Sequence, residues 1–137
     1  DSALRAVDDA VELALDAGVP RENVVVLGFS QGACLASEYV YRNPERYGGL
    51  AALSGCLIGP EGTTWPDADE ECTDGTPAFF GCDEDDPHVP AFRVRESADA
   101  YRERGADVTM RLYEGLGHQV NADEMDWVRD ALDDLLD

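Results

Sequence analysis

The sequence predicts an α/β fold in which a mostly parallel sheet is flanked by helices. Short apolar runs of strand length alternate with longer amphipathic segments of helix length along the chain. One of these runs, residues 24–27, leads directly into a Gly-x-Ser-x-Gly turn at residues 28–32. This motif functions where a strand precedes it and a helix follows it. With 137 residues, the chain is expected to form a single domain over residues 1–137.

The first expected element is a surface helix that Asp1 and Ser2 can cap and that Gly18 and Pro20 end. Its apolar residues fall on one face, namely Leu4, Val7, Val11, Ala14 and Leu15. Residues 24–27, with the sequence VVVL, follow as a strand. Because all four side chains are apolar and three are β-branched, we expect this strand to be buried on both faces.

Ser30 occupies the tip of the turn that follows this strand. We expect Gly28 and Gly32 to let the backbones of strand and helix cross closely, because neither carries a side chain. The turn should expose the Ser30 hydroxyl and direct the N–H of Gln31 toward an oxyanion that forms beside it. A lone Gly-x-Ser-x-Gly match also arises by chance, so a catalytic Ser30 requires a base and an orienting acid elsewhere.

Behind the turn, residues 33–41 predict a buried helix that stops at Asn43 and Pro44. The apolar run at residues 49–53, GLAAL, is typical of the next parallel strand.

Residues 56–76 have no helical or strand period and are rich in Gly, Pro, Asp and Glu, which predicts a long loop. Long loops at strand ends often form binding walls, so Leu57, Ile58 and Trp65 are candidates for an acyl pocket. Trp65 could equally well anchor the loop to the core. The carboxylates of residues 67–74 lack any fixed ligand spacing, which favours solvation over cation binding.

The second half of the chain repeats the pattern of strand, loop and helix. Residues 77–82 predict a strand that ends in the acidic run 83–86. Residues 90–104 predict a helix, and residues 108–113 alternate as a fourth strand that leads to His118.

A final helix is expected after Asn121, which forms a capping pair with Glu124. Its predicted inner stripe consists of Met125, Val128, Leu132 and Leu135.

Charge is the strongest signal in the composition. The chain has 30 acidic and 10 basic residues, a formal net charge of −20, and every basic residue is Arg. We therefore expect neither a nucleic acid nor an anionic membrane as a partner, because each requires a basic patch. The acids are spread along amphipathic segments, which favours the solvated acidic coat of a halophilic protein in a high-salt cytoplasm. No run of eighteen apolar residues indicates a membrane span.

The four cysteines are Cys34, Cys56, Cys72 and Cys82. They show no Cys-x-x-Cys spacing and no clustered His, so we do not expect a zinc site. They could form two disulfides in an oxidising compartment, but free or buried thiols are the expectation, with Cys34 in the core.

Three residue types that acyl transfer requires fall in loops after three different strands. They are Ser30, an Asp within residues 83–86, and His118. Since the carboxyl ends of parallel strands meet at one edge of a sheet, these side chains should converge there. A neutral imidazole could take the serine proton during attack, with the carboxylate holding the imidazole in place.

The stretches GFSQGACLA, FFGCDEDDPHVP and YEGLGHQV resemble the three signature stretches of the phospholipase/carboxylesterase branch of the α/β-hydrolases, which includes acyl-protein thioesterase-like enzymes. The resemblance implies an α/β-hydrolase fold without a cofactor. It places the nucleophile at Ser30, the acid at Asp86 just before Pro87, the base at His118, and one oxyanion donor at Gln31. The other acids of the run, Asp83, Glu84 and Asp85, are expected to be solvated.

Four further residues are expected near the substrate: Phe29, Leu57, Trp65 and His88. His88 lies two residues beyond Asp86 and would compete with it for the same position, so it suits the pocket rim, or a cap of the following helix, better than the role of base.

The resemblance covers roughly the later two-thirds of such a domain. The family's first strands, and the His-Gly-rich loop that supplies a second oxyanion donor, have no counterpart in these residues. We therefore expect the exposed edge of residues 24–27 to be covered by an upstream segment or by a second copy of the chain.

The function predicted from these observations is hydrolysis of small-molecule carboxylic esters or thioesters through an acyl-enzyme. The alternative from another class is a non-catalytic fragment, or a degenerate hydrolase fold, that serves as a binding module. A dienelactone-type hydrolase or a peptidase is a third reading, although the first would carry Cys as its nucleophile.

Overall fold

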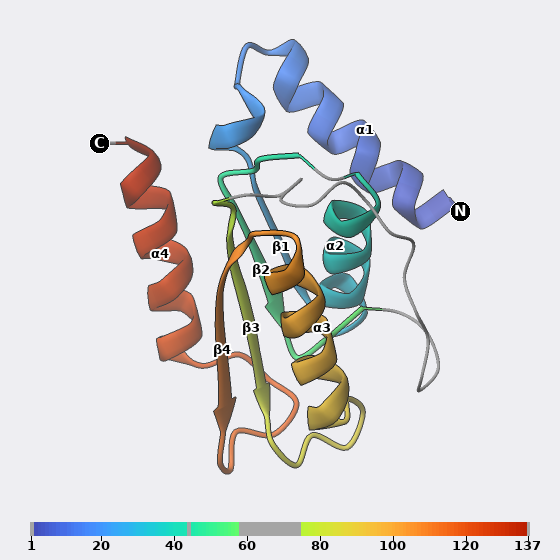
Figure 1. The fold of residues 1–137 in the computed structure, drawn as a ribbon, viewed down its shortest axis with the longest axis vertical. Helices are drawn as coiled ribbons and strands as arrows, with labels where there is room; N and C mark the ends of the chain where they lie inside the picture. The colour runs from blue at the N-terminus through green and yellow to red at the C-terminus, as the bar shows by residue number, and fades with distance from the viewer. Residues whose placement is uncertain (1, 44, 58–74, 137) are drawn as a thin grey trace.

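The computed structural model describes residues 2–43, 45–57 and 75–136, and within them a sheet lies between two unequal layers of helices (Figure 1). The order of elements is α1 (Ser2–Asp16), the 3₁₀ turn η1 (Arg21–Asn23), β1 (Val25–Phe29), α2 (Gln31–Arg42), β2 (Gly49–Leu53), β3 (Pro77–Asp83), α3 (Ala91–Glu103), β4 (Asp107–Tyr113) and α4 (Ala122–Leu136). The predicted α/β fold class is confirmed.

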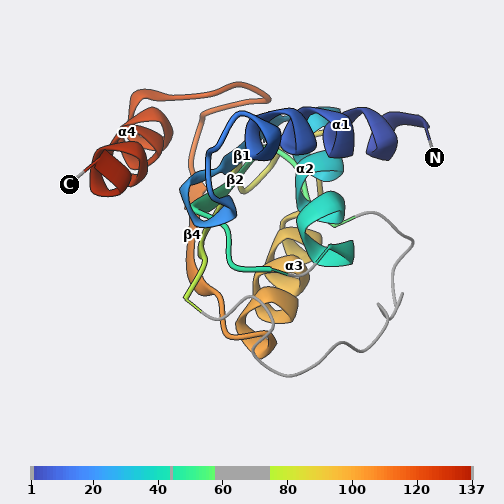
Figure 2. The same ribbon diagram turned by 90° about the horizontal axis from the view of Figure 1, so that it is seen from above.

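The four strands form one parallel sheet in the order β1-β2-β3-β4. Helices α1, α2 and α3 lie on one face, and α4 lies on the other (Figure 2). The main core forms on the three-helix face, where Tyr39, Leu50 and Phe80 are each at most 1% exposed. A smaller cluster of Ala51, Leu53, Phe79 and Val128 lies under α4.

The expectation that the first strand is buried on both faces is wrong. Val26 is buried under the helices, but Leu27 and Phe29, which alternate to the other face, are 48% and 41% exposed. The reason is that β1 lies at the edge of the sheet, whereas α4 packs over β2 and β3.

The capping pair of the last helix is confirmed. Asn121 Oδ1 accepts the Glu124 N–H at 2.8 Å, and Glu124 Oε1 accepts the Asn121 N–H at 3.1 Å. The predicted inner stripe is partly wrong, because Met125 and Leu132 are each 45% exposed. The inner face of α4 instead carries Glu124, Trp127 and Val128, since the capping pair turns Glu124 inward and the Trp127 ring packs 5.1 Å from that of Phe79.

Among the residues that the structure describes, no helix is long and apolar enough to cross a membrane. The predicted loop at residues 56–76 falls largely outside them, and with it Ile58, Trp65, Cys72 and the carboxylates of residues 67–74.

Candidate active site

Ser30 lies at a sharp turn between the end of β1 and the start of α2. Its backbone has φ 59° and ψ −120°, an unfavourable conformation for a residue with a side chain. The turn is held because the Ser30 N–H donates to Leu53 O at 2.9 Å, and Ser30 O accepts the Ala33 N–H at 3.0 Å. Strand β2 and the first turn of α2 thus fix the position of the hydroxyl.

The two glycines of the turn differ in what they contribute. A Cβ on Gly28 would lie 2.1 Å from Gly32 O, so this close crossing requires glycine. A Cβ on Gly32 would meet no atom within 4 Å, which contradicts the expectation for that position. Gly32 faces a groove beside β1, and this groove leaves space for a side chain.

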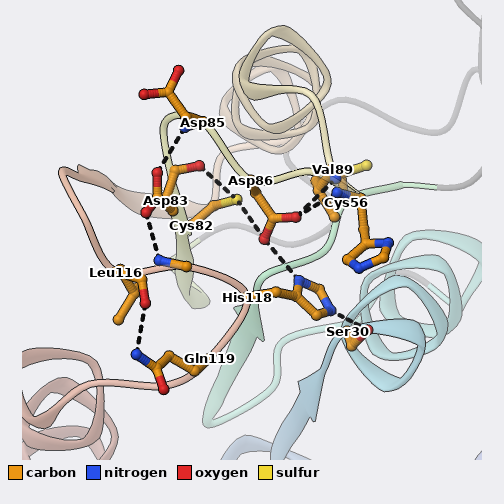
Figure 3. Close-up of polar contacts among 12 residues, drawn as sticks. Ser30, Cys56, Cys82, Asp83, Asp85, Asp86, Val89, Leu116, His118 and Gln119 are labelled. Atoms are coloured by element: carbon orange, nitrogen blue, oxygen red, sulfur yellow. Dashed lines mark hydrogen bonds and ion pairs between the residues drawn. The ribbon is translucent and has the colours of Figure 1, made fainter.

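Three predicted side chains meet in one chain of hydrogen bonds at the carboxyl edge of the sheet (Figure 3). Ser30 Oγ lies 2.6 Å from His118 Nε2, and His118 Nδ1 lies 2.7 Å from Asp86 Oδ2. These distances suit a serine hydroxyl that donates to Nε2 and an Nδ1–H that donates to the carboxylate. The three side chains follow three different strands: Ser30 follows β1, Asp86 lies in the turn after β3, and His118 lies in the loop after β4.

The Asp86 carboxylate is buried and well supplied with donors. Its side chain is fully buried, and Oδ1 accepts the backbone N–H groups of His88 at 2.7 Å and Val89 at 3.1 Å. Burial alone would raise the pKa of Asp86, but the hydrogen bonds from His118 and His88 outweigh it and lower that pKa. Asp86 therefore stays ionised beside His118.

Asp83 has a role that the sequence reasoning missed. It was expected to be solvated, yet it is only 4% exposed. Its Oδ1 accepts the Asp85 N–H at 2.7 Å and its Oδ2 accepts the Gly117 N–H at 2.5 Å, and the latter contact is the main reason that its pKa is lowered. Asp83 thereby holds the loop that carries His118, whereas Glu84 and Asp85 are exposed as expected.

The remaining predicted residues lie at different distances from this hydrogen-bonded chain. The rings of Phe29 and His88 are exposed and lie 5.1 Å and 4.7 Å from the His118 ring. Leu57 is 1% exposed and packs in the main core, with its N–H donating to Ser97 Oγ. Gln31 is the first residue of α2, where backbone N–H groups have no partner within the helix.

Other polar groups at this edge suit no metal ion. In the described ranges, no group of three or more His, Cys, Asp or Glu side chains is placed to hold one.

Cys82 is buried, and its thiol lies 3.8 Å from Asp86 Oδ2. Cys34 is only half-buried, so the expectation that it belongs to the core is not met.

Comparison with known proteins gives consistent matches. The chain is 30% identical to acyl-protein thioesterase 1 of Kluyveromyces lactis over 131 residues, which cover 90% of this chain and 55% of that protein. It is 29% identical to acyl-protein thioesterase 1 of Saccharomyces cerevisiae over 132 residues, which cover 91% of this chain and 55% of that protein. The chain thus spans about half the length of the curated relatives it matches.

Solved structures agree with this result. A crystal structure of a phospholipase/carboxylesterase from Dyadobacter fermentans matches with a TM-score of 0.85 and 36% identity, over 98% of this chain and 62% of that one. The Bacillus cereus carboxylesterase matches in fold, with a TM-score of 0.74 and 20% identity, over 96% of this chain and 59% of that one. The family model for phospholipases and carboxylesterases matches residues 1–136. The chain therefore belongs to the phospholipase/carboxylesterase family of α/β-hydrolases.

Proposed function

We propose that this chain supplies the catalytic residues of a serine hydrolase that cleaves carboxylic esters or thioesters through an acyl-enzyme. The observation that carries the proposal is the continuous hydrogen-bonded chain from Ser30 through His118 to Asp86, with links of 2.6 Å and 2.7 Å. A nucleophile, a base and an orienting acid in this arrangement are sufficient for acyl transfer when a donor for the oxyanion is close by.

In the first half of the reaction, His118 Nε2 takes the proton of Ser30 as Oγ attacks the acyl carbon. Asp86 keeps the ring in the tautomer that accepts this proton and stabilises the imidazolium that results. The N–H of Gln31, at the positive end of α2, stabilises the oxyanion. His118 then gives its proton to the departing alcohol or thiol, and water later releases the acyl group by the same path.

Small-molecule esters and thioesters with short or medium acyl groups are the proposed substrates. Relatives named acyl-protein thioesterase and carboxylesterase support both leaving groups, an alcohol and a thiol. Phe29 and His88 lie beside the His118 ring, so we assign them to the rim of the substrate site. A panel of p-nitrophenyl esters and acyl thioesters separates the two classes of leaving group.

We also propose that the active form has a further strand along β1. Within the described residues β1 pairs on one side only, with β2. An apolar groove of about 610 Å³ follows this edge between α1, β1 and α2, and its lining includes Val7, Val11 and Leu35. An exposed apolar strand edge is a template for another strand, donated by a further segment of a longer protein or by a second copy.

A fluorophosphonate probe tests the catalytic proposal, because it bonds covalently only to an activated serine. We expect labelling of the wild type at Ser30, no labelling of Ser30→Ala, and retained labelling of the control His88→Ala. The probe should be applied to this chain alone and to a longer protein that contains it. Absence of labelling in both forms would favour the alternative, a hydrolase fold that serves as a binding module.

A further inference from the structure

Two cysteines on neighbouring elements lie against each other beside Ser30. Cys34 is in the first turn of α2, and Cys56 follows β2, 22 residues later. The Cys56 N–H lies 3.5 Å from Cys34 Sγ, which places the two residues side by side. Both are free, and Cys34 is the more exposed of the two.

The backbones on the two sides of this pair are closely packed. A Cβ on Gly55, the residue before Cys56, would lie 2.5 Å from Ala33 Cβ and 2.7 Å from Ser30 O. The loop after β2 is therefore in direct contact with the first turn of α2. Its position is further fixed by the Leu57 N–H, which donates to Ser97 Oγ at 2.9 Å.

The electrostatics of the pair favour one reactive thiolate. The hydrogen bond from the Cys56 thiol outweighs the effect of burial and lowers the pKa of Cys34 to about 6, and the backbone N–H of Cys56 acts in the same direction. The same hydrogen bond, together with burial, raises the pKa of Cys56. These shifts favour the thiolate form at Cys34, the more exposed sulfur, over the thiolate form at Cys56.

The third described cysteine has different surroundings. Cys82 is fully buried at the end of β3, and its thiol lies near Asp83 O and the Asp86 carboxylate. Burial is the main cause of its raised pKa, and the neighbouring carboxylates add to it. Its sulfur thus stays protonated and unreactive. The reactivity of Cys34 and Cys56 can therefore be compared with that of Cys82 within the same protein.

We propose that Cys34 and Cys56 are a redox modification site, at which a peroxide converts the two thiols into a disulfide that ties the loop after β2 to the start of α2. The Cys34 thiolate attacks one peroxide oxygen, the O–O bond breaks, and a sulfenic acid forms together with water or an alcohol. The Cys56 sulfur then attacks Cys34 Sγ, the S–O bond breaks, water leaves, and the S–S bond forms. A dithiol reductant reverses the change.

This site does not depend on the proposed hydrolase function, since neither sulfur belongs to the hydrogen-bonded chain of Ser30, His118 and Asp86. The disulfide would close a loop that runs from the helix behind Ser30 through β2. Closing such a loop restricts the unfolded chain, so oxidation should raise the thermal midpoint by several degrees.

The test treats the protein with a small excess of hydrogen peroxide, blocks remaining thiols by alkylation, and maps the peptides without reduction. We expect two of the four thiols to be lost and the linked peptides to contain Cys34 and Cys56. Dithiothreitol should restore both thiols and the original thermal midpoint. The control Cys72→Ser should form the same link.

In Cys56→Ser, the oxidation should stop at a Cys34 sulfenic acid that dimedone traps, with no rise in the thermal midpoint. The peptide map of the oxidised wild-type protein is decisive by itself, because it does not depend on the folding of any variant. Linkage of Cys34 or Cys56 to Cys72, a link between two molecules, or retention of all four thiols at full peroxide consumption would overturn the proposal.

Discussion

Strands β1 and β3 each deliver a residue to the same hydrogen-bonded chain, but their surroundings differ greatly. Residues 78–83 of β3 are buried, and β3 pairs with strands on both sides. On β1, Leu27 and Phe29 are 48% and 41% exposed, and β2 is its partner. The acid thus follows an interior strand, and the loop of the base is bonded to Asp83 of that same strand, whereas the nucleophile follows a strand at the margin of the sheet.

This difference indicates which parts of the candidate site the described residues hold in place by themselves. Asp86 and the loop of His118 are fixed by several hydrogen bonds from β3 and its following turn. Ser30 is fixed on the β2 side, through Leu53 O. Changes on the β3 side should therefore act on chemistry directly, while changes on β1 should depend on what covers it.

The largest effect is expected for His118→Ala, measured as ester turnover in a protein form that the fluorophosphonate probe labels. Loss of the base leaves the Ser30 hydroxyl without a proton acceptor, so kcat should fall by on the order of 10⁴-fold or more. His88→Ala is the matched control, because its ring lies beside His118 but outside the chain of hydrogen bonds. Greater loss in the His88 variant would reverse the assignment of the base.

Two substitutions distinguish the roles of the two buried carboxylates, Asp83 at the end of β3 and Asp86 in the turn after it. They are Asp86→Asn and Asp83→Asn. We expect Asp86→Asn to lower kcat by roughly 10³- to 10⁴-fold, because the amide favours the wrong tautomer of His118. Asp83→Asn should lower kcat by about tenfold, since it weakens the hold on Gly117 and touches no reacting atom. Steady-state kinetics over pH 5 to 9 measures both. Equal losses would mean that Asp83 shares the orienting role.

Leu53→Ala and Leu27→Ala test the contrast in burial, because both side chains lie on the α4 face of the sheet. Leu53 is 2% exposed, so its truncation should lower the free energy of unfolding by about 3 kcal/mol. In the isolated chain, the change at Leu27 should stay near 0.5 kcal/mol, roughly the scale of a surface substitution. Denaturant unfolding measures both. In a form with β1 covered, Leu27→Ala should cost about as much as Leu53→Ala.

The sequence predicted the order of elements well, because each depends on local signals. The run at 49–53 appears unchanged as β2, and Asn121 and Glu124 cap α4 as their spacing indicated. Ser30 and His118 could be placed at one sheet edge because both follow strands that run parallel.

The exposures of Leu27 and Met125 could not be read from local patterns. Leu27 lies in an apolar run typical of a central strand, yet its burial depends on a neighbour that the run does not encode. Met125 fits the helical period, but the capping pair turned Glu124 inward instead. The role of Asp83 required knowing that Gly117, 34 residues away, lies beside its carboxylate. Such contacts arise from the assembled sheet.

Salt tests the predicted acidic coat, which follows from the net charge of the chain. With a net charge of −20, repulsion among surface carboxylates should dominate in dilute buffer. We expect the thermal midpoint to rise as potassium chloride is increased to molar concentrations, with similar gains for the wild type and for Leu27→Ala. A flat or falling midpoint would contradict the halophilic interpretation, and with it the expected cytoplasmic location in a high-salt cell.

A pH-dependent effect on stability is expected at Glu124, whose carboxyl is buried beneath Gly81 of β3. Its Oε1 completes the capping pair, but its Oε2 is buried and has no hydrogen-bond partner among the residues that the structure describes. Burial raises the pKa of Glu124, so the native state favours the protonated form. The resulting stability is present below the pKa of the unfolded chain and is lost as pH rises through the higher native pKa.

Glu124→Gln keeps an oxygen for Asn121 and carries no charge at any pH. The variant should therefore match the wild type near pH 4 and exceed it by about 1 kcal/mol at pH 8, measured by denaturant unfolding. A variant that is less stable at pH 8 than the wild type would show that the buried charge is compensated, and that the α4 face of β3 is better satisfied than its unpaired oxygen indicates.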